Sequence, residues 1–397
     1  MEEAQMKIPH LFTCPISLDL FTDPVTLCTG HTYDRPSIEK WLAAGNLTCP
    51  ITMQKLHDPS LVPNHTLRHL IEQWRQMCHR LDPDYFSTLD PLATLKHSLE
   101  SHKVSFEEKR RTLERIQVIA EESPSTGSLL LQLGFLPLLL RLILEKVEPE
   151  AFNEYEKFAE EALRWVLRLS SLGELGSLNM LRGGSTLESF HLLFEHGCSE
   201  IKTSLCHLVE AISSSSETKD LCTMIGNNPR FLHGILFLLH QNADSSEAGI
   251  RAISALCSSE SNRENLVQVG IINGLVIYIL NSDRRERSLA GTSMTIIEQL
   301  LELETGKEAV INGANHVKAL VKMVFRVSDH EGSESAVNSL MIICQESLQA
   351  REKAIAAGVL TQLLLLLQSQ CSGRTKTKAR MLLKLLRSKW DEDQKFM

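Results

Sequence analysis

Four side chains near the start of the sequence have the types and spacing of zinc ligands. Cys14, Cys28, His31 and Cys49 belong to the pairs Cys14-x-x-Ser17, Cys28-x-x-His31, Asp34-x-x-Ser37 and Cys49-x-x-Thr52. A cross-braced domain with two zinc ions needs four pairs of Cys or His ligands, and half of those ligands are missing here. The first site would offer one thiolate among hydroxyl and carboxyl groups, which makes a poor tetrahedral zinc site, so we reject zinc there.

The second site would retain Cys28, His31 and Cys49 beside Thr52, so residual zinc is one alternative. The other is a metal-free domain in which hydrogen bonds and packing replace the ions and satisfy the buried polar groups. We favour the metal-free domain, with no cofactor. The residues that we expect in its polar network are Ser17, Tyr33, Asp34, Ser37 and Thr52.

The elements that hold these residues must be short, because proline recurs too often for long helices. One helix is predicted from about Pro36 to Leu42, and a second follows Asn64, with apolar residues at helical spacing. We therefore predict a small domain over residues 8–78. A segment rich in Asp and Pro follows, which we interpret as a linker over residues 79–94. The prolines are Pro9, Pro15, Pro24, Pro36, Pro50, Pro59 and Pro63.

Beyond residue 94 proline becomes rare and a repeat emerges. A glycine that precedes an apolar helix recurs at intervals of 50, 42, 44, 43 and 45 residues, and all but the first interval match the roughly 40–47 residues of armadillo or HEAT units. Such units stack into a solenoid because none can bury its apolar face alone. We predict about six repeats over residues 95–390 and a tail over 391–397. The glycines are Gly134, Gly184, Gly226, Gly270, Gly313 and Gly358.

The whole composition fits a folded protein. The chain has 397 residues, 43% of them apolar, and a formal net charge of −8. No basic block with interleaved aromatic residues appears, which argues against nucleic-acid binding. The start of the sequence lacks the layout of a secretory signal, and its longest apolar runs are too short for a membrane span. We expect a cytoplasmic protein, with the nucleus as the alternative.

The first domain resembles the U-box throughout, over residues 8–77. The resemblance is carried by Phe12 to Val25, by the stretches Gly30-His-Thr-Tyr-Asp-Arg35 and Ile38-Glu-Lys-Trp41, by Cys49-Pro-Ile-Thr52, and by Leu61-Val-Pro-Asn-His-Thr-Leu-Arg68. Together with the armadillo-like repeats, the chain resembles the plant U-box armadillo ubiquitin ligases. The fold implied is mainly α: a small α+β zinc-free U-box, similar to a RING domain, followed by an all-α superhelical solenoid.

The resemblance implies a ligase without a nucleophile of its own. It would bind a conjugating enzyme that carries ubiquitin as a thioester, and ubiquitin would pass directly to a lysine of a substrate held by the repeats. Catalysis would then consist of positioning. No Cys is expected to be essential as an attacking thiol. The residues expected to bind the conjugating enzyme are Ile16, Leu18, Trp41, Pro50, Ile51 and Met53.

One position departs from the family pattern. Many U-boxes have Arg or Lys directly after the residue that matches Thr52, and here Met53 occupies that place, followed by Gln54 and Lys55. A thioether cannot donate the hydrogen bond that a basic side chain would make. Two alternatives remain open: the activity is weaker, or Gln54 or Lys55 donates the hydrogen bond in place of the missing basic side chain. A rival hypothesis is a non-catalytic armadillo scaffold with a degenerate U-box.

The remaining expectations also follow from the resemblance. Family members commonly act in plant stress or immune signalling and in protein turnover. The expected partners are the ubiquitin-loaded conjugating enzyme and a substrate protein, and a U-box homodimer is a further assembly that the family permits.

Overall fold

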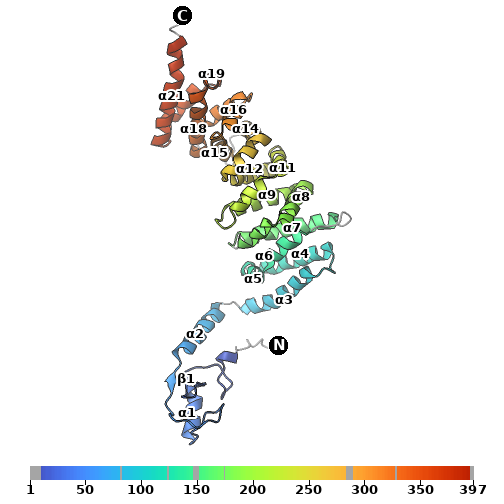
Figure 1. The fold of residues 1–397 in the computed structure, drawn as a ribbon, viewed down its shortest axis with the longest axis vertical. Helices are drawn as coiled ribbons and strands as arrows, with labels where there is room; N and C mark the ends of the chain where they lie inside the picture. The colour runs from blue at the N-terminus through green and yellow to red at the C-terminus, as the bar shows by residue number, and fades with distance from the viewer. Residues whose placement is uncertain are drawn as a thin grey trace. The chain divides into compact units, whose positions relative to one another are not determined.

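The computed structural model describes residues 10–80, 83–122, 125–145, 152–173, 175–282, 289–326 and 329–393. Contacts divide the chain into two compact units, Met1–Asp90 and Pro91–Met397, which we call the front unit and the rear unit. Figure 1 shows short strands and loops in the front unit and stacked helices in the rear unit. This is the predicted fold class, a small α+β domain followed by an all-α solenoid.

The front unit is built from short elements, as its prolines require. A three-stranded antiparallel sheet in the order β2-β1-β3 forms its centre. In the register, Val25 of β1 lies opposite Tyr33 of β2 and Pro63 of β3. The elements are the 3-10 helix His10–Phe12, β1 Pro24–Thr26, β2 Thr32–Asp34, α1 Arg35–Ala43, β3 Val62–Pro63 and α2 His65–Arg80.

Helix α1 begins and ends where the sequence signals predict. Pro36 lies in its first turn, where the missing amide proton removes no helical bond, and Asp34 occupies the N-cap position. The helix stops before Gly45, which has a φ of 86° and donates its amide to Leu42. Ile38 is its buried residue, so this one side chain anchors the helix to the sheet.

One small core holds the front unit together. Its buried members come from loops as well as from the sheet and the helices, and Trp41 packs against them half-buried. Two of the members are thiols, which behave as small apolar groups when buried. The core residues are Cys14, Phe21, Val25, Leu27, Tyr33, Ile38, Cys49, Leu56 and Ile71.

The range predicted as a linker, 79–94, is helical in its described part. Helix α2 ends at Arg80, and α3 spans Pro83–Glu100 with Pro91 inside it. Pro83 starts α3, a position that proline tolerates well. The Asp and Pro residues therefore mark a helix start rather than an irregular segment, while the domain limits themselves stay a prediction. The predicted tail, 391–397, lies outside the described residues from 394 onward.

The rear unit repeats a short helix, an apolar helix and a long helix. Six such groups follow one another in the described residues: α5-α6-α7, the 3-10 helix with α8-α9, α10-α11-α12, α13-α14-α15, α16-α17-α18 and α19-α20-α21. Figure 1 shows α9, α12, α15, α18 and α21 in succession along one side, and α8, α11 and α14 along the other. Each long helix contacts the long helix of the next group, as in α9 with α12 and α15 with α18.

The bounds of these helices are as follows: α4 Phe106–Glu122, α5 Thr126–Gln132, α6 Phe135–Ile143, α7 Phe152–Ser170, the 3-10 helix Leu175–Arg182, α8 Gly184–His196, α9 Ser199–Ser213, α10 Asp220–Gly226, α11 Pro229–Leu238, α12 Ala243–Cys257, α13 Glu260–Val269, α14 Ile271–Asn281, α15 Ala290–Leu300, α16 Glu304–Asn312, α17 His316–Met323, α18 His330–Glu346, α19 Leu348–Ala356, α20 Val359–Gln368 and α21 Gly373–Asp393.

The recurring glycines mark the junction between the short and the apolar helix, but not always in the same way. Gly270 has a φ of 88° and turns the chain from α13 into α14, and Gly134 and Gly358 adopt the same left-handed conformation. Gly184, Gly226 and Gly313 lie at the equivalent junctions without it. The repeat spacing is therefore a property of the helix pairs, and only three of its glycines serve as left-handed turns.

Candidate functional site

Two loops of the front unit have the same geometry. The first loop, Thr13–Leu20, and the second loop, Thr48–Lys55, are each closed by an isolated antiparallel bridge between their end residues. In the first loop the amide of Leu18 donates to the carbonyl of Cys14 at 2.9 Å. In the second loop the amide of Met53 donates to the carbonyl of Cys49 at 2.8 Å. The segments Cys14–Leu18 and Cys49–Met53 therefore share one pattern of backbone hydrogen bonds, residue for residue.

Each loop contains one residue with a left-handed backbone. Leu18 has a φ of 60° and Met53 a φ of 57°, and they are the two non-glycine residues of the described chain with a positive φ. This conformation costs an L-residue about 1–2 kcal/mol. Both side chains are also exposed, at 76% and 64%. A loop that keeps a strained backbone and an exposed apolar side chain at one position is characteristic of a functional surface.

Both loops are tied to neighbouring residues of β2 through their thiols. The amide of Asp34 donates to the sulfur of Cys14 at 3.2 Å. The hydroxyl of Tyr33 contacts the sulfur of Cys49 at 3.0 Å and accepts the amide proton of Ile51 at 3.2 Å. Because the hydroxyl accepts from Ile51, its own proton is free to bond with the sulfur. Strand β2 thus brings together two loops that are far apart in the sequence.

The electrostatics of this cluster favour a thiolate at Cys49. Burial opposes ionisation of the thiol, but polar contacts with Thr29, Thr52 and Tyr33 outweigh it and lower the pKa of Cys49 to about 6. Burial and the bond to Cys49 raise the pKa of Tyr33, so the phenol keeps its proton. At Cys14, burial again opposes ionisation, while bonds from the backbone of Asp34 and Ser17 lower the pKa. Hydrogen-bond donors thus surround both sulfurs.

The carboxylate of Asp34 fixes the chain just before β1. It accepts hydrogen bonds from the amide and hydroxyl of Thr22, at 2.9 and 2.8 Å, and from the amide of Asp23 at 2.7 Å. Asp23 in turn pairs with Arg35 of α1 at 2.6 Å and with Arg68 of α2. The bond from Arg35 outweighs burial and lowers the pKa of Asp23. Sequence analysis missed this second carboxylate.

The predicted polar network is therefore two clusters rather than one. Tyr33 and Thr52 belong to the cluster around Cys49, and Asp34 and Ser17 to the cluster around Cys14. Ser37 is half-buried on α1, and the described residues offer its hydroxyl no hydrogen-bond partner.

The candidate ligands of the second zinc site, Cys28, His31 and Cys49, do not form a metal-binding cluster in the described residues. Cys28 is exposed and Cys49 is buried. Among the residues that the structure describes, no group of three or more His, Cys, Asp or Glu side chains is placed to share a metal ion.

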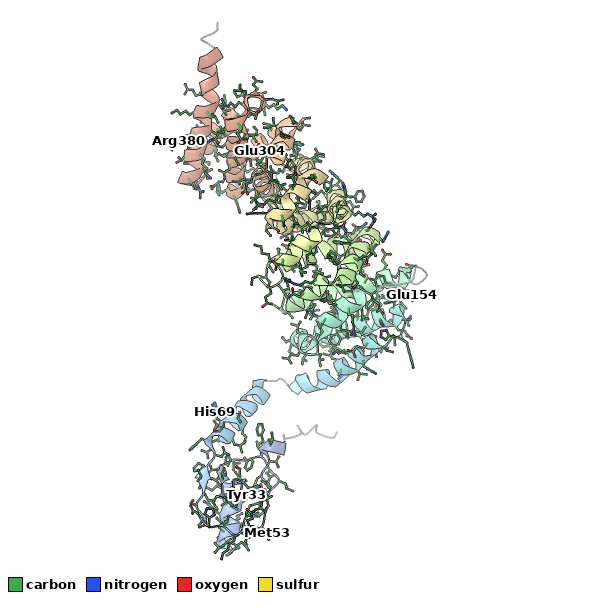
Figure 2. All side chains as sticks on the ribbon, viewed as in Figure 1. Tyr33, Met53, His69, Glu154, Glu304 and Arg380 are labelled. Carbon is green, nitrogen blue, oxygen red and sulfur yellow. The ribbon has the colours of Figure 1, made fainter. Side chains whose placement is uncertain are left out.

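The tips of the two loops present an apolar surface. Ile16 and Ile51, which occupy the same place in the two loops, are 36% and 50% exposed, and Leu18 and Met53 follow them two residues later in the sequence. Pro50 is half-buried. Figure 2 shows Met53 at the edge of the front unit and Tyr33 in its interior. Exposed apolar patches on a small domain mark partner sites.

Trp41 supports this surface from α1. Its indole N–H donates to the carbonyl of Thr48 at 2.9 Å, which fixes the base of the second loop. The ring itself is half-buried against the core. Leu47, at 53% exposure beside Thr48, is a further apolar candidate that sequence analysis did not include. Its only sequence signal is an apolar residue directly after the Gly45-Asn46 turn.

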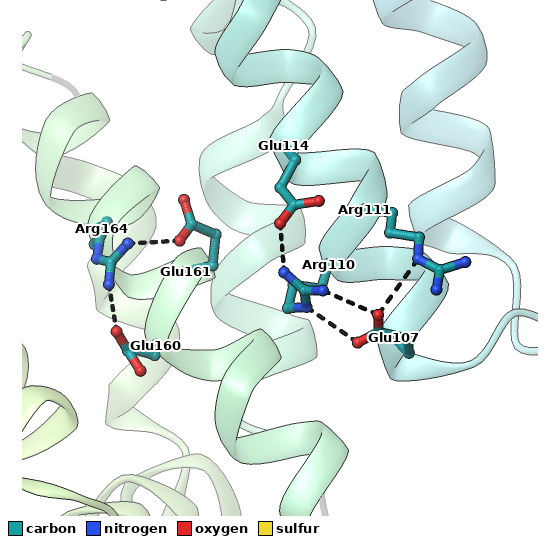
Figure 3. A network of polar contacts seen from close by, with 7 residues as sticks. All are labelled: Glu107, Arg110, Arg111, Glu114, Glu160, Glu161 and Arg164. Carbon is teal, nitrogen blue, oxygen red and sulfur yellow. Dashed lines mark hydrogen bonds and ion pairs between the residues drawn. The ribbon is translucent and has the colours of Figure 1, made fainter.

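The long helices of the rear unit carry paired charges. Figure 3 shows Arg110 of α4 held between Glu107 and Glu114, and Arg164 of α7 held between Glu160 and Glu161. In later groups the pairs join neighbouring long helices, as in Arg251 with Glu210 at 3.2 Å and Lys378 with Glu334 at 3.3 Å. Side chains of both charge signs therefore lie close together on these helices.

Comparison with known proteins identifies both units. The U-box domain model matches residues 8–79, and the model of the plant U-box protein ARM repeat region matches residues 93–397. The chain belongs to the plant U-box proteins with an armadillo-repeat region. Family members pair a U-box with armadillo repeats, in the order of the front and rear units.

Relatives in this family share nearly the whole chain. U-box domain-containing protein 26 of Arabidopsis thaliana is 34% identical over 98% of this chain and 94% of its own length. E3 ubiquitin-protein ligase PUB23 of the same plant is 27% identical over 98% of this chain and 95% of its own length. Both cover the U-box and the repeats together.

Solved structures support the solenoid fold of the rear unit. UNC-45 from Drosophila melanogaster has a TM-score of 0.52 with 18% identity, and it covers 68% of this chain and 33% of its own. A computationally designed armadillo repeat protein has a TM-score of 0.50 with 17% identity over 63% of this chain and 99% of its own.

In the described residues no single helix has the length and apolar content of a membrane span. Two pairs of consecutive helices reach this length and apolar content when the two helices are taken together, but each pair is bent by more than 40°. The pairs are Thr126–Gln132 with Phe135–Ile143 and Glu260–Val269 with Ile271–Asn281.

Proposed function

We propose that this U-box protein is an E3 ubiquitin ligase whose two matched loops bind a ubiquitin-loaded conjugating enzyme. The observation that carries the proposal is the shared geometry of the loops, each of which exposes an isoleucine and a left-handed apolar residue. Two rigid apolar tips and a half-buried tryptophan form a preorganised surface, so binding would require little ordering. The names of relatives such as PUB23 support the same activity.

The chain would accelerate ubiquitin transfer by positioning. The thioester of the conjugating enzyme already contains the reactive bond, and a substrate lysine attacks it directly. Holding the two in an attack geometry removes translational and orientational freedom, an effect that reaches about 7–11 kcal/mol in well-oriented systems. Cys14 and Cys49 are buried and hydrogen-bonded, so neither is available to form a covalent ubiquitin intermediate.

The rear unit would hold the substrate. Its repeated long helices form an extended surface with both charge signs, as solenoids that bind proteins do. Membership of a plant family supports a plant protein as the substrate. We propose that its ubiquitination serves protein turnover or stress or immune signalling. A substrate trap made with the Ile51→Ala variant, compared with the wild type by crosslinking and mass spectrometry, tests this part.

An autoubiquitination assay with a panel of conjugating enzymes tests the activity. Ile51→Ala, Ile16→Ala and Pro50→Ala are each expected to lower the rate at least about tenfold, because each removes apolar area from the docking surface. Val62→Ala is a matched control, since Val62 is 60% exposed on β3 outside the two loops. Equal rates for Ile51→Ala and Val62→Ala would contradict the proposal.

A non-catalytic scaffold is the second candidate, and Met53 favours it. Met53 occupies the left-handed position of the second loop. A basic side chain at this position would be able to donate a hydrogen bond, whereas the thioether of methionine has no proton to donate. Met53→Arg separates the two candidates. Autoubiquitination by the wild type would support the ligase. If only the Met53→Arg variant ubiquitinates itself, the wild-type chain is a scaffold.

A further inference from the structure

The last repeat of the rear unit exposes positions that are buried in earlier repeats. The apolar helices α14, α17 and α20 share a pair of residues: Leu275-Val276, Leu320-Val321 and Leu363-Leu364. The first residue of each pair is fully buried. Val276 and Val321 are 1% and 2% exposed, whereas Leu364 is 54% exposed. No helical group follows α21 in the described residues, so nothing there covers Leu364.

The long helices show the same change. Ile253 of α12, Ile297 of α15 and Val337 of α18 are completely buried, and each follows a buried Ala or Ile. The equivalent residue of α21 follows the buried Ala379, and it is the exposed Arg380. Figure 2 shows Arg380 on the outer side of α21. A place that receives apolar packing in three earlier repeats thus carries a cation in the last one.

Helix α21 is strongly basic up to Arg387. Two of its cations, Arg374 and Lys378, lie 3.7 and 3.3 Å from Glu334 of α18. Lys376, Arg380 and Lys384 are spaced by four residues and so share one face. The described residues give these three no ion-pair partner. Residues 373–387 contain no Asp or Glu at all, and their cations are Arg374, Lys376, Lys378, Arg380, Lys384 and Arg387.

These residues together form what we call the terminal face. It consists of Leu364 and Leu365 of α20, which are 54% and 39% exposed, Met381 of α21 at 56%, and the cations Lys376, Arg380 and Lys384. A solenoid end needs only a polar outer surface to stay soluble. The cations meet that need, but the two exposed leucines do not.

We propose that the terminal face binds an amphipathic helix of a partner protein, with apolar residues on one side and acidic residues flanking them. A helix fits because helices of the next group pack on earlier groups of the rear unit, as α17 and α18 pack on α14 and α15, and α20 and α21 on α17 and α18. Acidic flanks fit because Lys376, Arg380 and Lys384 have no carboxylate partner among the residues that the structure describes, and complementary charge selects partners. The proposal concerns a second interaction surface and does not depend on the activity of the front unit.

Binding of synthetic peptides to the full-length chain tests this inference. The probe is a fluorescent helical peptide with Leu at every third or fourth position and Glu elsewhere. A second peptide has Lys in place of Glu, and a third keeps Glu but has Ala in place of Leu. We expect the Glu-Leu peptide to bind at least about tenfold more tightly than the other two, as measured by fluorescence anisotropy at low and moderate salt.

Two variants locate the binding. Leu364→Gln and the double change Arg380→Glu with Lys384→Glu are each expected to weaken the Glu-Leu peptide about tenfold or more. Phe237→Gln is the matched control, because Phe237 is 60% exposed on α11 in the middle of the rear unit. All three changes affect exposed side chains, and circular dichroism melting curves verify that the variants stay folded.

Several results would overturn the inference. Equal binding of the Glu-Leu and Lys-Leu peptides, or unchanged binding by both variants, would show that the terminal face does not select an acidic helix. Light scattering that reveals a dimer lost in Leu364→Gln would assign the face to a second copy of the chain. Cosedimentation with anionic vesicles, lost in the charge-reversal variant while peptides fail to bind, would assign it to lipid. Autoubiquitination should be unchanged in both variants, which separates this test from that of the front unit.

Discussion

The polar contacts within the front unit differ in kind from those within the rear unit. In the front unit each polar tie occurs once and joins distant parts of the chain, as Asp34 does with Thr22 and Asp23, or Asp23 with Arg68. In the rear unit similar ties recur at about one repeat length. Arg263 pairs with Glu302, and Lys307 pairs with Glu346 in the next repeat.

This difference predicts different responses to substitution. A contact that occurs once has no substitute, so its loss affects the whole of a small domain. A contact that is repeated along a solenoid contributes one of many similar terms to the stability of neighbouring repeats. The front unit should therefore be sensitive to single polar changes, and the rear unit tolerant of them.

The largest effect is expected from Asp34→Ala. Removing the carboxylate leaves the part-buried amides of Thr22 and Asp23 without their acceptor, which costs about 2 kcal/mol of unfolding free energy. Hydrogen exchange followed by mass spectrometry measures this at β1 and α1 separately from the rear unit. Asp58→Ala is the control, because the exposed Asp58 bonds only with Ser60. Equal hydrogen-exchange protection of the front unit in Asp34→Ala and Asp58→Ala would contradict the proposed sensitivity of the front unit to single polar changes.

The second effect is a pH dependence confined to the front unit. The pKa of Cys49 is lowered from 9.0 to about 6 in the fold, so between these pH values the unfolded chain binds the extra proton. The unfolding free energy should therefore rise with pH from about 6 to 9, by at most about 1.4 kcal/mol per pH unit, and this contribution is lost as the pH falls through 6.

Cys49→Ser tests the origin of this dependence. A hydroxyl does not ionise in this range, so the variant should lose the slope, whereas Cys28→Ser, at an exposed thiol, should retain it. Denaturant titrations of the front unit at several pH values measure the slopes. A slope that survives in Cys49→Ser would mean that another group titrates.

A smaller effect is expected from Met53→Gly. Glycine adopts the left-handed backbone without strain, although it also increases the entropy of the unfolded chain. The net result should be a stabilisation of about 0.5 kcal/mol, with reduced binding of the conjugating enzyme because the exposed thioether is lost. Leu18→Gly should behave alike if the loops are equivalent. Thermal melting together with the ubiquitination assay distinguishes stability from activity, and a strong destabilisation would argue against the shared loop geometry.

The smallest effect is expected in the rear unit from Lys307→Met. This change removes the ion pairs with Glu304 and Glu346 but keeps most of the aliphatic side chain. The expected loss of unfolding free energy is small, because the partner carboxylates are exposed and water screens such pairs. Lys318→Met, at an exposed position of α17, is the control, and both are compared by denaturant unfolding. A loss as large as that of Asp34→Ala would break the contrast between the two units.

Sequence alone predicted the order of the units and much of their local structure. Helix α1 was expected over Pro36–Leu42 and spans Arg35–Ala43, because proline and glycine act locally. The repeat was visible because apolar residues and glycines recur with the helix pairs. The linker over residues 79–94 stays a prediction, and its described part is helical, because a proline such as Pro83 is compatible with a helix start as well as with a loop.

Features that depend on contacts between distant residues were not predictable in this way. The polar network was expected to include Ser37, but its hydroxyl has no hydrogen-bond partner in the described residues. The pairing of Asp23 with Arg35 and Arg68 was missed because no local pattern marks it. The matched backbones of the two loops have a sequence trace in Cys14-Pro-Ile-Ser and Cys49-Pro-Ile-Thr, but their left-handed residues do not.

Direct titration of a ubiquitin-loaded conjugating enzyme tests the central claim, that the loop tips of the front unit are its binding site. With a stable mimic of the loaded enzyme, calorimetry should show saturable binding to the full-length chain. Ile51→Ala should weaken this binding about tenfold, and Val62→Ala should leave it unchanged. A folded wild-type chain that binds no member of a broad panel of conjugating enzymes, or that binds one equally well after Ile51→Ala, would contradict the account.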